Sequence, residues 1–353
     1  GLKAHKRNTI YNGPIKCSAL QFVIRSEGSD LSQTLTLDNS PFANRLKKNF
    51  KHRQKWARKN DITCYRIYDK DLPDYAVAID YYEGDAHIQE YEAPKDIPYN
   101  KAQQRVDHIL RVTPDILGIP ARHVHLKVRR KQRGTTQYEK QDSTGRFFVI
   151  NEGGAKFLVN FHDYLDTGIF LDHRKTRAMV SKYAKGKSFL NLFAYTGTAT
   201  VYAAMGGAAS STTVDISNTY LDWAERNFEL NNLNQRDHLL VRDDCLEWLR
   251  KSDTKFGLIF LDPPTFSNSK KMDRTFDIQR DHVELLRLAL NRLESDGLLI
   301  FSNNSRQFKL DAQALGNLDI QAISEQTIPD DFARNKRIHQ CWKIRHQLDQ
   351  SSC

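Results

Sequence analysis

The sequence predicts an α/β protein whose second half folds into a doubly wound, mostly parallel sheet. From residue 172 onward, short apolar runs alternate with amphipathic segments, as parallel strands alternate with their crossover helices. A glycine turn at Gly197 separates the first run from its helix, and later runs end on Asp215, on Asp243 and Asp244, and on Asp262. Because the carboxyl ends of parallel strands meet at one edge of a sheet, these acidic side chains should line one crevice.

The first half of the chain divides into smaller pieces. Residues 1–28 predict two short strands, 8–11 and 15–24, and we expect them to be the C-terminal remnant of an upstream domain. Residues 29–60 predict a linker and a basic helix that begins with Ser40 as N-cap and Pro41 at its first position. Residues 61–160 predict a mixed α/β lobe of three strands, a helix over 100–117, a strand over 123–129 and hairpin-like strands at 147–150 and 156–160.

Residues 161–353 form the predicted sheet domain. Apolar runs place strands at 188–194, 210–215, 238–241, 256–261 and 297–302, with two more near 317–324 and 339–346. Amphipathic segments place helices near 172–183, 217–232, 244–251 and 278–294, and a further helix runs from the first glycine turn to residues 206–207. The sequence therefore predicts seven strands joined mainly by helical crossovers.

Composition narrows the class of protein. With 353 residues and a mean hydropathy of -0.63, the chain is long enough for two domains, and it has no apolar run of the ~20 residues that span a membrane. Five scattered cysteines form no CxxC pair, which disfavours a zinc site or a disulfide framework and favours a reducing cytoplasm. The chain begins with Gly1, so we expect it to be a piece of a longer product.

Positive charge is concentrated in the first half. Of the 53 Lys and Arg and 43 Asp and Glu in the chain, residues 1–160 hold 28 and 18, so this half carries the whole net charge of +10. A neutral second half beside a basic lobe is typical of a cofactor domain with a surface for a polyanion. The expected RNA-binding residues lie on the basic helix and on a basic loop that follows residue 128: Arg45, Lys48, Lys51, Arg129, Arg130, Lys131 and Arg133. A merely solvated helix face is the alternative for the first three.

The acidic strand ends indicate the cofactor. Three carboxylates and a glycine turn suit a ligand with a ribose, an adenine and a cationic sulfur, namely S-adenosylmethionine, with S-adenosylhomocysteine as product. A dinucleotide is disfavoured because no second glycine follows Gly197 at the required spacing. Asp215 is placed to accept from the ribose hydroxyls, and Asp244 from the adenine amino group with the Cys245 amide facing the ring. Each aspartate alone could be a helix cap, and Asp243 competes with Asp244.

Other residues around the same turns complete the expected cofactor contacts. Asp172 and Arg174 precede the sheet, although an aspartate at a helix start is often only a cap. The remaining contacts are expected from Asn191, Phe193, Thr196, Gly197, Ile216 and Asp262. His123 and His125 share one face of a strand, but the sequence offers no third ligand, so we expect no metal site.

The segment Asp262-Pro263-Pro264-Thr265 carries the expected catalytic chemistry. Two successive prolines fix the backbone and remove two N–H donors, so the loop offers carbonyl oxygens and the Asp262 carboxylate. Methyltransferases that act on amines use such a loop, with an aromatic fourth residue where this chain has Thr265. Asp262, Pro263 and Asn303 are the predicted catalytic residues, and Ser302 is a further candidate for the edge of the base. A plain proline turn is the alternative.

Across nearly its whole length the chain resembles the RlmK half of the bacterial bifunctional RlmKL ribosomal RNA methyltransferases. The resemblance is carried by residues 11–17, 42–46, 64–69, 72–77, 170–174, 191–197 and 262–269. It implies a class I methyltransferase fold, transfer of a methyl group to N7 of a guanine in 23S ribosomal RNA, and an upstream methyltransferase domain in the same polypeptide.

The residues themselves bear on which atom would be methylated. Methylation of cytosine C5 needs a cysteine nucleophile, and the segments 262–267 and 301–305 contain none. Guanine N7 has a free lone pair, so its methylation needs alignment rather than a base. Two alternatives stay open: methylation of an exocyclic amine (guanine N2 or adenine N6), and a non-catalytic RNA-binding module for assembly.

Overall fold

The computed structural model describes residues 6–12, 15–21, 38–91, 99–129, 144–267 and 275–347. The chain divides into two compact units, Gly1–Asn39 and Ser40–Cys353. In the first unit, β1 (Lys6–Asn12) and β2 (Ile15–Gln21) pair as an antiparallel hairpin, as the sequence predicts.

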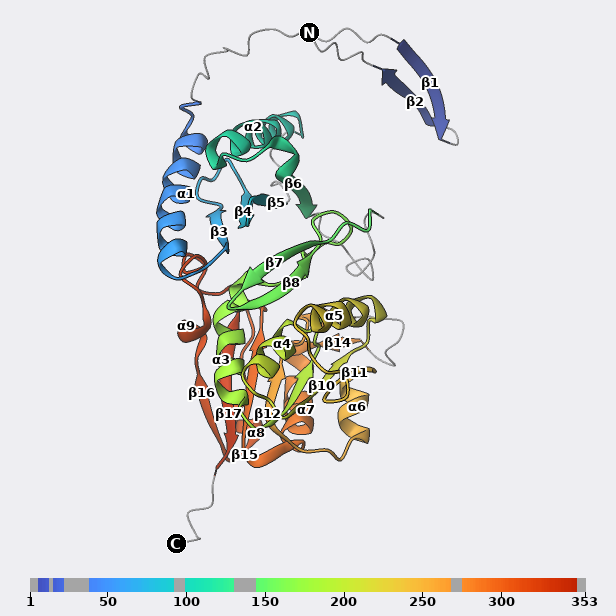
Figure 1. The fold of residues 1–353 in the computed structure, drawn as a ribbon, viewed down its shortest axis with the longest axis vertical. Helices are drawn as coiled ribbons and strands as arrows, with labels where there is room; N and C mark the ends of the chain where they lie inside the picture. The colour runs from blue at the N-terminus through green and yellow to red at the C-terminus, as the bar shows by residue number, and fades with distance from the viewer. Residues whose placement is uncertain are drawn as a thin grey trace. The chain divides into compact units, whose positions relative to one another are not determined.

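The second unit begins with a lobe built on a four-stranded sheet (Figure 1). The strands lie in the order β3 (Cys64–Asp69), β4 (Val77–Tyr82), β5 (Asp85–Tyr91) and β6 (Val124–Arg129). Helices α1 (Pro41–Lys59) and α2 (Tyr99–Leu117) pack against one another and supply the core of the lobe from Phe42, Leu46 and Ile109. A short 3₁₀ turn, Ala121–His123, leads into β6.

The start of α1 confirms the predicted cap. The Ser40 hydroxyl accepts from the Ala43 N–H at 3.2 Å, and Pro41 occupies the first helical turn, where its missing N–H costs nothing. The buried face of α1 carries Phe42, Ala43, Leu46 and Ala57, which leaves most of its Lys and Arg side chains on the other face.

A hairpin of β7 (Phe148–Glu152) and β8 (Ala155–Val159) lies between the lobe and the larger sheet (Figure 1). Its Phe157 and Val159 share a cluster with Cys64 and Tyr82 of the lobe and with Phe228 beyond the hairpin. This continuous apolar contact joins the lobe to the sheet domain within one compact unit.

The sheet domain contains a seven-stranded sheet in the order β11-β10-β9-β12-β15-β17-β16. The strands are β9 (Ser188–Leu192), β10 (Ser210–Asp215), β11 (His238–Arg242), β12 (Phe256–Leu261), β15 (Leu293–Asn303), β16 (Leu318–Ala322) and β17 (Gln340–His346). Only β17 runs antiparallel to its two neighbours. This confirms the predicted doubly wound, mostly parallel sheet. Two differences in type are at residues 293–294, which begin β15 instead of ending a helix, and at Ser324, which begins α9 instead of ending a strand.

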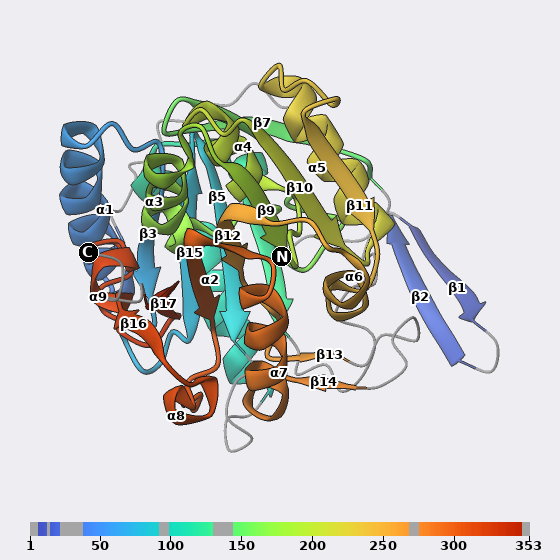
Figure 2. The same cartoon turned by 90° about the horizontal axis from the view of Figure 1, so that it is seen from below.

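Helices cover both faces of this sheet (Figure 2). One face carries α3 (Arg174–Ala184), α4 (Thr198–Met205) and α5 (Asn218–Leu230), and the other carries α6 (Cys245–Lys251) and α7 (Ile278–Leu290). Successive side chains of a strand point to opposite faces of the sheet. In β12, Leu258 therefore packs with Val180 of α3 on one face, and Ile259 packs with Leu285 of α7 on the other. Short elements complete the domain: 3₁₀ turn Leu171–His173, β13 (Phe266–Ser267), β14 (Phe276–Asp277), α8 (Ala312–Leu315) and α9 (Ser324–Thr327).

Among the helices that the structure describes, none combines the length and apolar character needed to cross a lipid bilayer.

Candidate active site at the carboxyl edge of the sheet

The turn between β9 and α4 is strained and tightly packed. Phe193, Tyr195 and Gly197 all have positive φ, at 55°, 52° and 70°. A Cβ atom on Gly197 would lie 2.9 Å from Ala224 Cβ and 2.9 Å from the Phe228 ring, so only glycine lets α4 approach α5 this closely. Gly197 therefore shapes the turn by packing the helices as well as by its backbone angle.

Asp215, at the end of β10, links this turn to the next one. Its carboxylate accepts from the Tyr195 N–H and the Ser217 N–H, both at 2.9 Å, and Ile216 lies between Asp215 and that second donor. Burial raises the pKa of Asp215 to about 6, and the backbone N–H groups only partly oppose this. A half-desolvated carboxylate beside a strained turn has acceptor capacity left for the hydroxyls of a ribose.

Asp244 and Cys245 begin α6 at the end of the third strand. Asp244 is the N-cap, and its Oδ1 accepts from the Leu246 and Glu247 N–H groups at 2.9 and 3.1 Å, so the helix-cap interpretation holds for that oxygen. The Cys245 thiol accepts from the Phe193 N–H at 3.2 Å, and burial raises its pKa well above the ordinary value. A thiol this buried is a packing group rather than a nucleophile.

Several predicted cofactor residues use their side chains inside the fold. Asn191 donates to Thr200 Oγ1 at 3.0 Å, and the Thr196 hydroxyl donates to the Gly168 carbonyl at 2.6 Å. Arg174 is paired with Asp331 (3.1 Å from Nη1 to Oδ1) and donates to the Cys64 carbonyl of β3. These three side chains brace the site, and any contact that they make with a ligand remains a prediction.

The Asp262 loop lies at the end of β12, beside the end of β15. Asp262 is half-buried, Pro263 is buried, and Thr265 is exposed with its hydroxyl 2.7 Å from Asn304 Oδ1. The Thr265 carbonyl also accepts from the Ile278 N–H that starts α7. The loop is thus pinned at its far end, and Phe266, the aromatic that follows, is 49% exposed.

Asn303 and Ser302 stand on the neighbouring strand end. Both side chains are fully buried, and the Asn303 Nδ2 and Ser302 Oγ atoms have no hydrogen-bond partner in the described part of the chain. Asn303 Oδ1 accepts from the Ser305 N–H at 3.0 Å, so its amide group has a fixed orientation. Buried donors without partners cost free energy and are characteristic of sites that a ligand completes.

A pair of stacked histidines lies behind Asp262. The rings of His173 and His339 are 4.4 Å apart at 20°, His339 Nδ1 is 3.1 Å from Asp172 Oδ2, and His173 Nε2 is 3.7 Å from Asp262 Oδ2. Burial would raise the pKa of Asp172, but His173 and His339 more than offset it, and the pKa falls well below the ordinary value. No sequence pattern points to His339, which lies 167 residues from Asp172.

Asp172, His173 and His339 also satisfy the spacing of a metal site, since one ligand atom from each lies within 4.8 Å of the others. The ring stacking argues against it, because two nearly parallel imidazoles direct their lone pairs along separate planes rather than toward one ion. In the lobe, Asp85 Oδ1 lies 3.2 and 2.7 Å from the ring nitrogens of His123 and His125, a contact that strand periodicity alone does not predict.

The predicted RNA-binding residues fall into two sets. Arg45, Lys48 and Lys51 are exposed along one side of α1. Arg129 ends β6, and Arg130, Lys131 and Arg133 lie outside the described residues.

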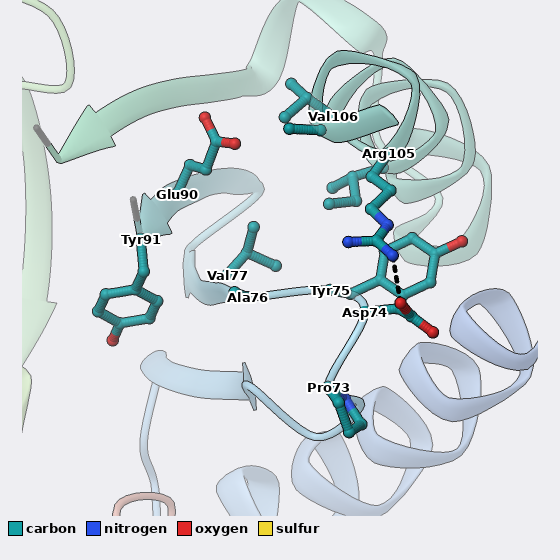
Figure 3. A pocket seen from close by; sticks show the side chains of 11 residues that line it. Pro73, Asp74, Tyr75, Ala76, Val77, Glu90, Tyr91, Arg105 and Val106 are labelled. Atoms are coloured by element: carbon teal, nitrogen blue, oxygen red, sulfur yellow. Dashed lines mark hydrogen bonds and ion pairs between the residues drawn. The ribbon is translucent and has the colours of Figure 1, made fainter. Parts of the chain in front are cut away.

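A small pocket in the lobe is separate from these sites (Figure 3). It lies between α2 and the strands β4 and β5, with Tyr75, Tyr91 and Val106 among its lining residues and Arg105 bonded to Asp74 at one side. None of the predicted cofactor or catalytic residues lines it.

Comparison with known proteins agrees with the chemistry at the sheet edge. A family model described as S-adenosylmethionine-dependent methyltransferase matches residues 69–313. Proteins named Ribosomal RNA large subunit methyltransferase K/L from Syntrophotalea carbinolica and Allochromatium vinosum are each 52% identical to the chain, over 98% of its length and 49% of theirs. The chain therefore spans about half the length of the curated relatives that it matches.

Solved structures give the same fold. A methyltransferase crystallised with S-adenosylhomocysteine is 25% identical, with a TM-score of 0.67, over 86% of this chain and 81% of its own. A SAM-dependent methyltransferase from Streptococcus mutans is also 25% identical, with a TM-score of 0.68, over 86% of this chain and 80% of its own.

Proposed function

The chain belongs to the S-adenosylmethionine-dependent methyltransferases of class I fold, and from this premise we propose that it methylates N7 of a guanine in 23S ribosomal RNA. The names of the relatives support ribosomal RNA of the large subunit as the substrate. The observation that favours N7 is the pair of unpartnered buried donors, Asn303 Nδ2 and Ser302 Oγ, on the strand next to Asp262. Guanine presents two acceptors, N7 and O6, on its major-groove edge, so donors can bind O6 while N7 is left to react.

The residues at the β9, β10 and β11 ends would hold the cofactor. Asp215 accepts hydroxyl protons, the positive-φ turn at Tyr195 and Gly197 brings backbone close to the ligand, and Asp244 Oδ2 is free of the cap contacts made by Oδ1. When bound, S-adenosylmethionine supplies an electrophilic methyl group on a sulfonium. Phe193 follows β9 and Ile216 follows β10, so both would flank the bound cofactor. Asp172 and Arg174, which precede the sheet, would support the cofactor site.

Asp262 would act on the target base. N7 has no proton to lose, so the loop needs no general base, and its task is alignment and electrostatic stabilisation. As the purine becomes cationic, the Asp262 carboxylate lies beside it with Pro263 and Pro264, which offer no N–H to neutralise the carboxylate. Asn303 would orient the base through its fixed amide. A helical target would have to open locally for the base to reach this depth.

The basic lobe would hold the RNA backbone. Arg45, Lys48 and Lys51 present exposed positive charge on a rigid helix, which suits phosphates rather than base sequence. Since the chain covers about half of its relatives, an upstream methyltransferase domain of the same polypeptide is the proposed partner, with this chain as the RlmK half. The buried free thiols of Cys64, Cys245 and Cys341 agree with a reducing cytoplasm.

Chemical mapping tests the proposal. The protein is incubated with unmodified 23S RNA and S-adenosylmethionine, and the RNA is treated with borohydride and aniline, which cleave at 7-methylguanine. A single new cleavage at a guanine is expected. Methylated RNA that resists cleavage would exclude N7.

Methylation of an exocyclic amine is the second candidate, because the Asp262 carboxylate could accept a proton from an amine. Thr265, which is bonded to Asn304 where amine-specific enzymes carry an aromatic residue, weighs against it. Mass analysis of digested RNA separates N2-methylguanine and N6-methyladenine from 7-methylguanine. An RNA-binding module without catalysis would show no affinity for S-adenosylmethionine by calorimetry.

A further inference from the structure

The stacked histidines account for more than packing. His339 is held on both sides, by Asp172 Oδ2 at 3.1 Å on Nδ1 and by Thr327 Oγ1 at 3.0 Å on Nε2. This ring is fully buried and cannot turn without breaking one of the two contacts. It therefore forms a fixed platform against which His173 stacks.

His173 lies between two carboxylates. Its Nε2 is 3.7 Å from Asp262 Oδ2 and 3.8 Å from Asp172 Oδ2, while its Nδ1 has no hydrogen-bond partner among the described residues. A proton on Nε2 faces both carboxylates, whereas a proton on Nδ1 would be a buried donor with no acceptor. The neutral ring with Nε2–H is the form that this environment favours.

The groups around His173 keep it uncharged. Burial lowers its pKa, the nearby His339 and Arg177 lower it further, and Asp262 and Asp172 raise it without restoring the ordinary value. Phe260 of β12 adds an aromatic edge at 6.4 Å. A neutral donor can orient a carboxylate without cancelling its charge, which an imidazolium would do.

We propose that His173 is a positioning residue for Asp262: backed by His339 and anchored through Asp172, its Nε2–H fixes the Asp262 carboxylate beside the target base while leaving it negative. This inference rests on the proposed function, in which Asp262 faces the base. The separation of 3.7 Å is too long for a hydrogen bond, and contacts of this kind commonly shorten when the substrate binds. In this arrangement Asp172 acts indirectly, by holding the His339 ring against which His173 stacks.

Two substitutions of His173 separate positioning from packing. His173→Phe keeps an aromatic ring on His339 and removes the donor, and we expect kcat to fall about 100-fold, the typical cost of a misplaced group, while the Kd for S-adenosylmethionine stays within about 2-fold. His173→Gln restores an N–H near the Nε2 position, and we expect it to recover kcat to within about 5-fold of wild type. His238→Phe is the matched control, since this histidine lies at the opposite end of the sheet, bonded to Ser211.

Two kinetic results would overturn the inference. Wild-type kcat in His173→Phe would show that no donor is needed. Equal losses in His173→Phe and His173→Gln, accompanied by a matching fall in melting temperature or cofactor affinity, would show that the ring only fills space.

A second measurement does not depend on RNA. Nitrogen NMR of the histidine rings in the whole chain reports the tautomer and titration of His173, in wild type and in Asp262→Asn. We expect the Nε2–H tautomer at neutral pH, and a lower ring pKa in Asp262→Asn because the carboxylate that raises it is gone. An unchanged titration would refute the contact. If wild type methylates no RNA, the proposed function fails, while this titration still decides whether His173 and Asp262 are coupled.

Discussion

The two halves of the sheet's carboxyl edge differ in how completely their polar groups are satisfied. On the β9–β10–β11 side, Asp215 and Asp244 each accept from two backbone N–H groups. On the β12–β15 side, Asp262 makes a long contact to His173, and Asn303 and Ser302 keep buried donors that have no partner among the described residues. The carboxylates of the first half are thus held by backbone N–H groups, and under the proposed function the second half would be completed by the target base.

The proposed function gives this difference a reason. A cofactor used in every turnover is best met by carboxylates that the backbone already holds in place, since no reorganisation is then needed. A target base brings hydrogen-bond acceptors with it. Each buried donor that is unpaired in the free protein costs about 1–3 kcal/mol, and this free energy is recovered when the donor binds the base. On this view, substitutions in the two halves should separate cofactor affinity from catalysis.

The largest expected effect tests that separation in the target half. Asp262→Asn keeps the shape and removes the charge beside the developing cation, so kcat should fall by about 100- to 1000-fold. The Kd for S-adenosylmethionine should stay within about 2-fold, because the carboxylates of the other half are untouched. Single-turnover methylation and calorimetry measure the two quantities. Loss of cofactor affinity in parallel with kcat would mean that the halves are one unit.

The reciprocal substitution lies in the cofactor half. Asp215→Ala removes a charged acceptor, which is worth about 1.5–3 kcal/mol, so cofactor affinity should fall by roughly 10- to 100-fold. At saturating cofactor, kcat should recover most of its wild-type value. Asp222→Ala, an exposed aspartate seven positions later on α5, is the matched control. An unchanged Kd in Asp215→Ala would remove the ribose assignment.

Sequence patterns predicted the strand ends in both halves of this edge. The strand ends at Asp215, Asp244 and Asp262 were predicted from local periodicity, because apolar alternation and helix capping depend only on residues that are close in sequence. The structure confirms the seven strands, the cap at Ser40 and the parallel order around β9, and at Asp244 it shows the helix cap that was the alternative to a cofactor contact.

The parts that sequence could not supply depend on contacts between distant segments. His339 meets Asp172 across 167 residues, and Arg174 meets Asp331 across 157, through loops that carry no pattern of their own. Asp85, the first residue of β5, likewise reaches His125 across 40 residues. Side-chain direction was also out of reach: Asn191 lies at the expected strand end, but its amide is committed to Thr200.

A smaller effect is expected from Asn303. Asn303→Ala removes the fixed amide donor, and the loss of one hydrogen bond to the base should lower kcat/KM by about 10-fold. Cofactor affinity should not change. Asn291→Ala, an exposed residue at the opposite edge of the sheet, is the control. An Asn303→Ala enzyme with normal kcat/KM would mean that its unpartnered donor is not used by the substrate.

The cofactor half should also show its own pH dependence. The free Asp215 carboxyl has a pKa of about 6, raised by burial, and only the ionised form accepts from two hydroxyls. Cofactor affinity should therefore fall about tenfold per pH unit below that value and be flat above it. The free energy of unfolding of the cofactor-free protein should depend on pH in the opposite direction. Burial favours protonated Asp215, so the stability that this group contributes is present at low pH and is lost as pH rises through about 6. Asp215→Asn should abolish both effects, and a wild-type Kd that is constant from pH 5 to 7 would contradict them.

If the target half gains its missing partners only from the base, most of the RNA affinity must come from elsewhere, and the basic helix α1 is the proposed source. Lys48 and Lys51 are exposed on the same side of α1, so the double substitution to Ala should reduce the slope of log affinity against log salt by about 1.4–1.8, the contribution of two phosphates. Lys185 and Lys251, exposed at the amino edge of the sheet, provide a double control of equal charge. Filter binding of a 23S RNA fragment between low and moderate salt measures the slopes. Equal slopes in the two double variants would show that net charge, rather than the surface of α1, attracts the RNA. The lobe would then have no special role in binding the RNA backbone.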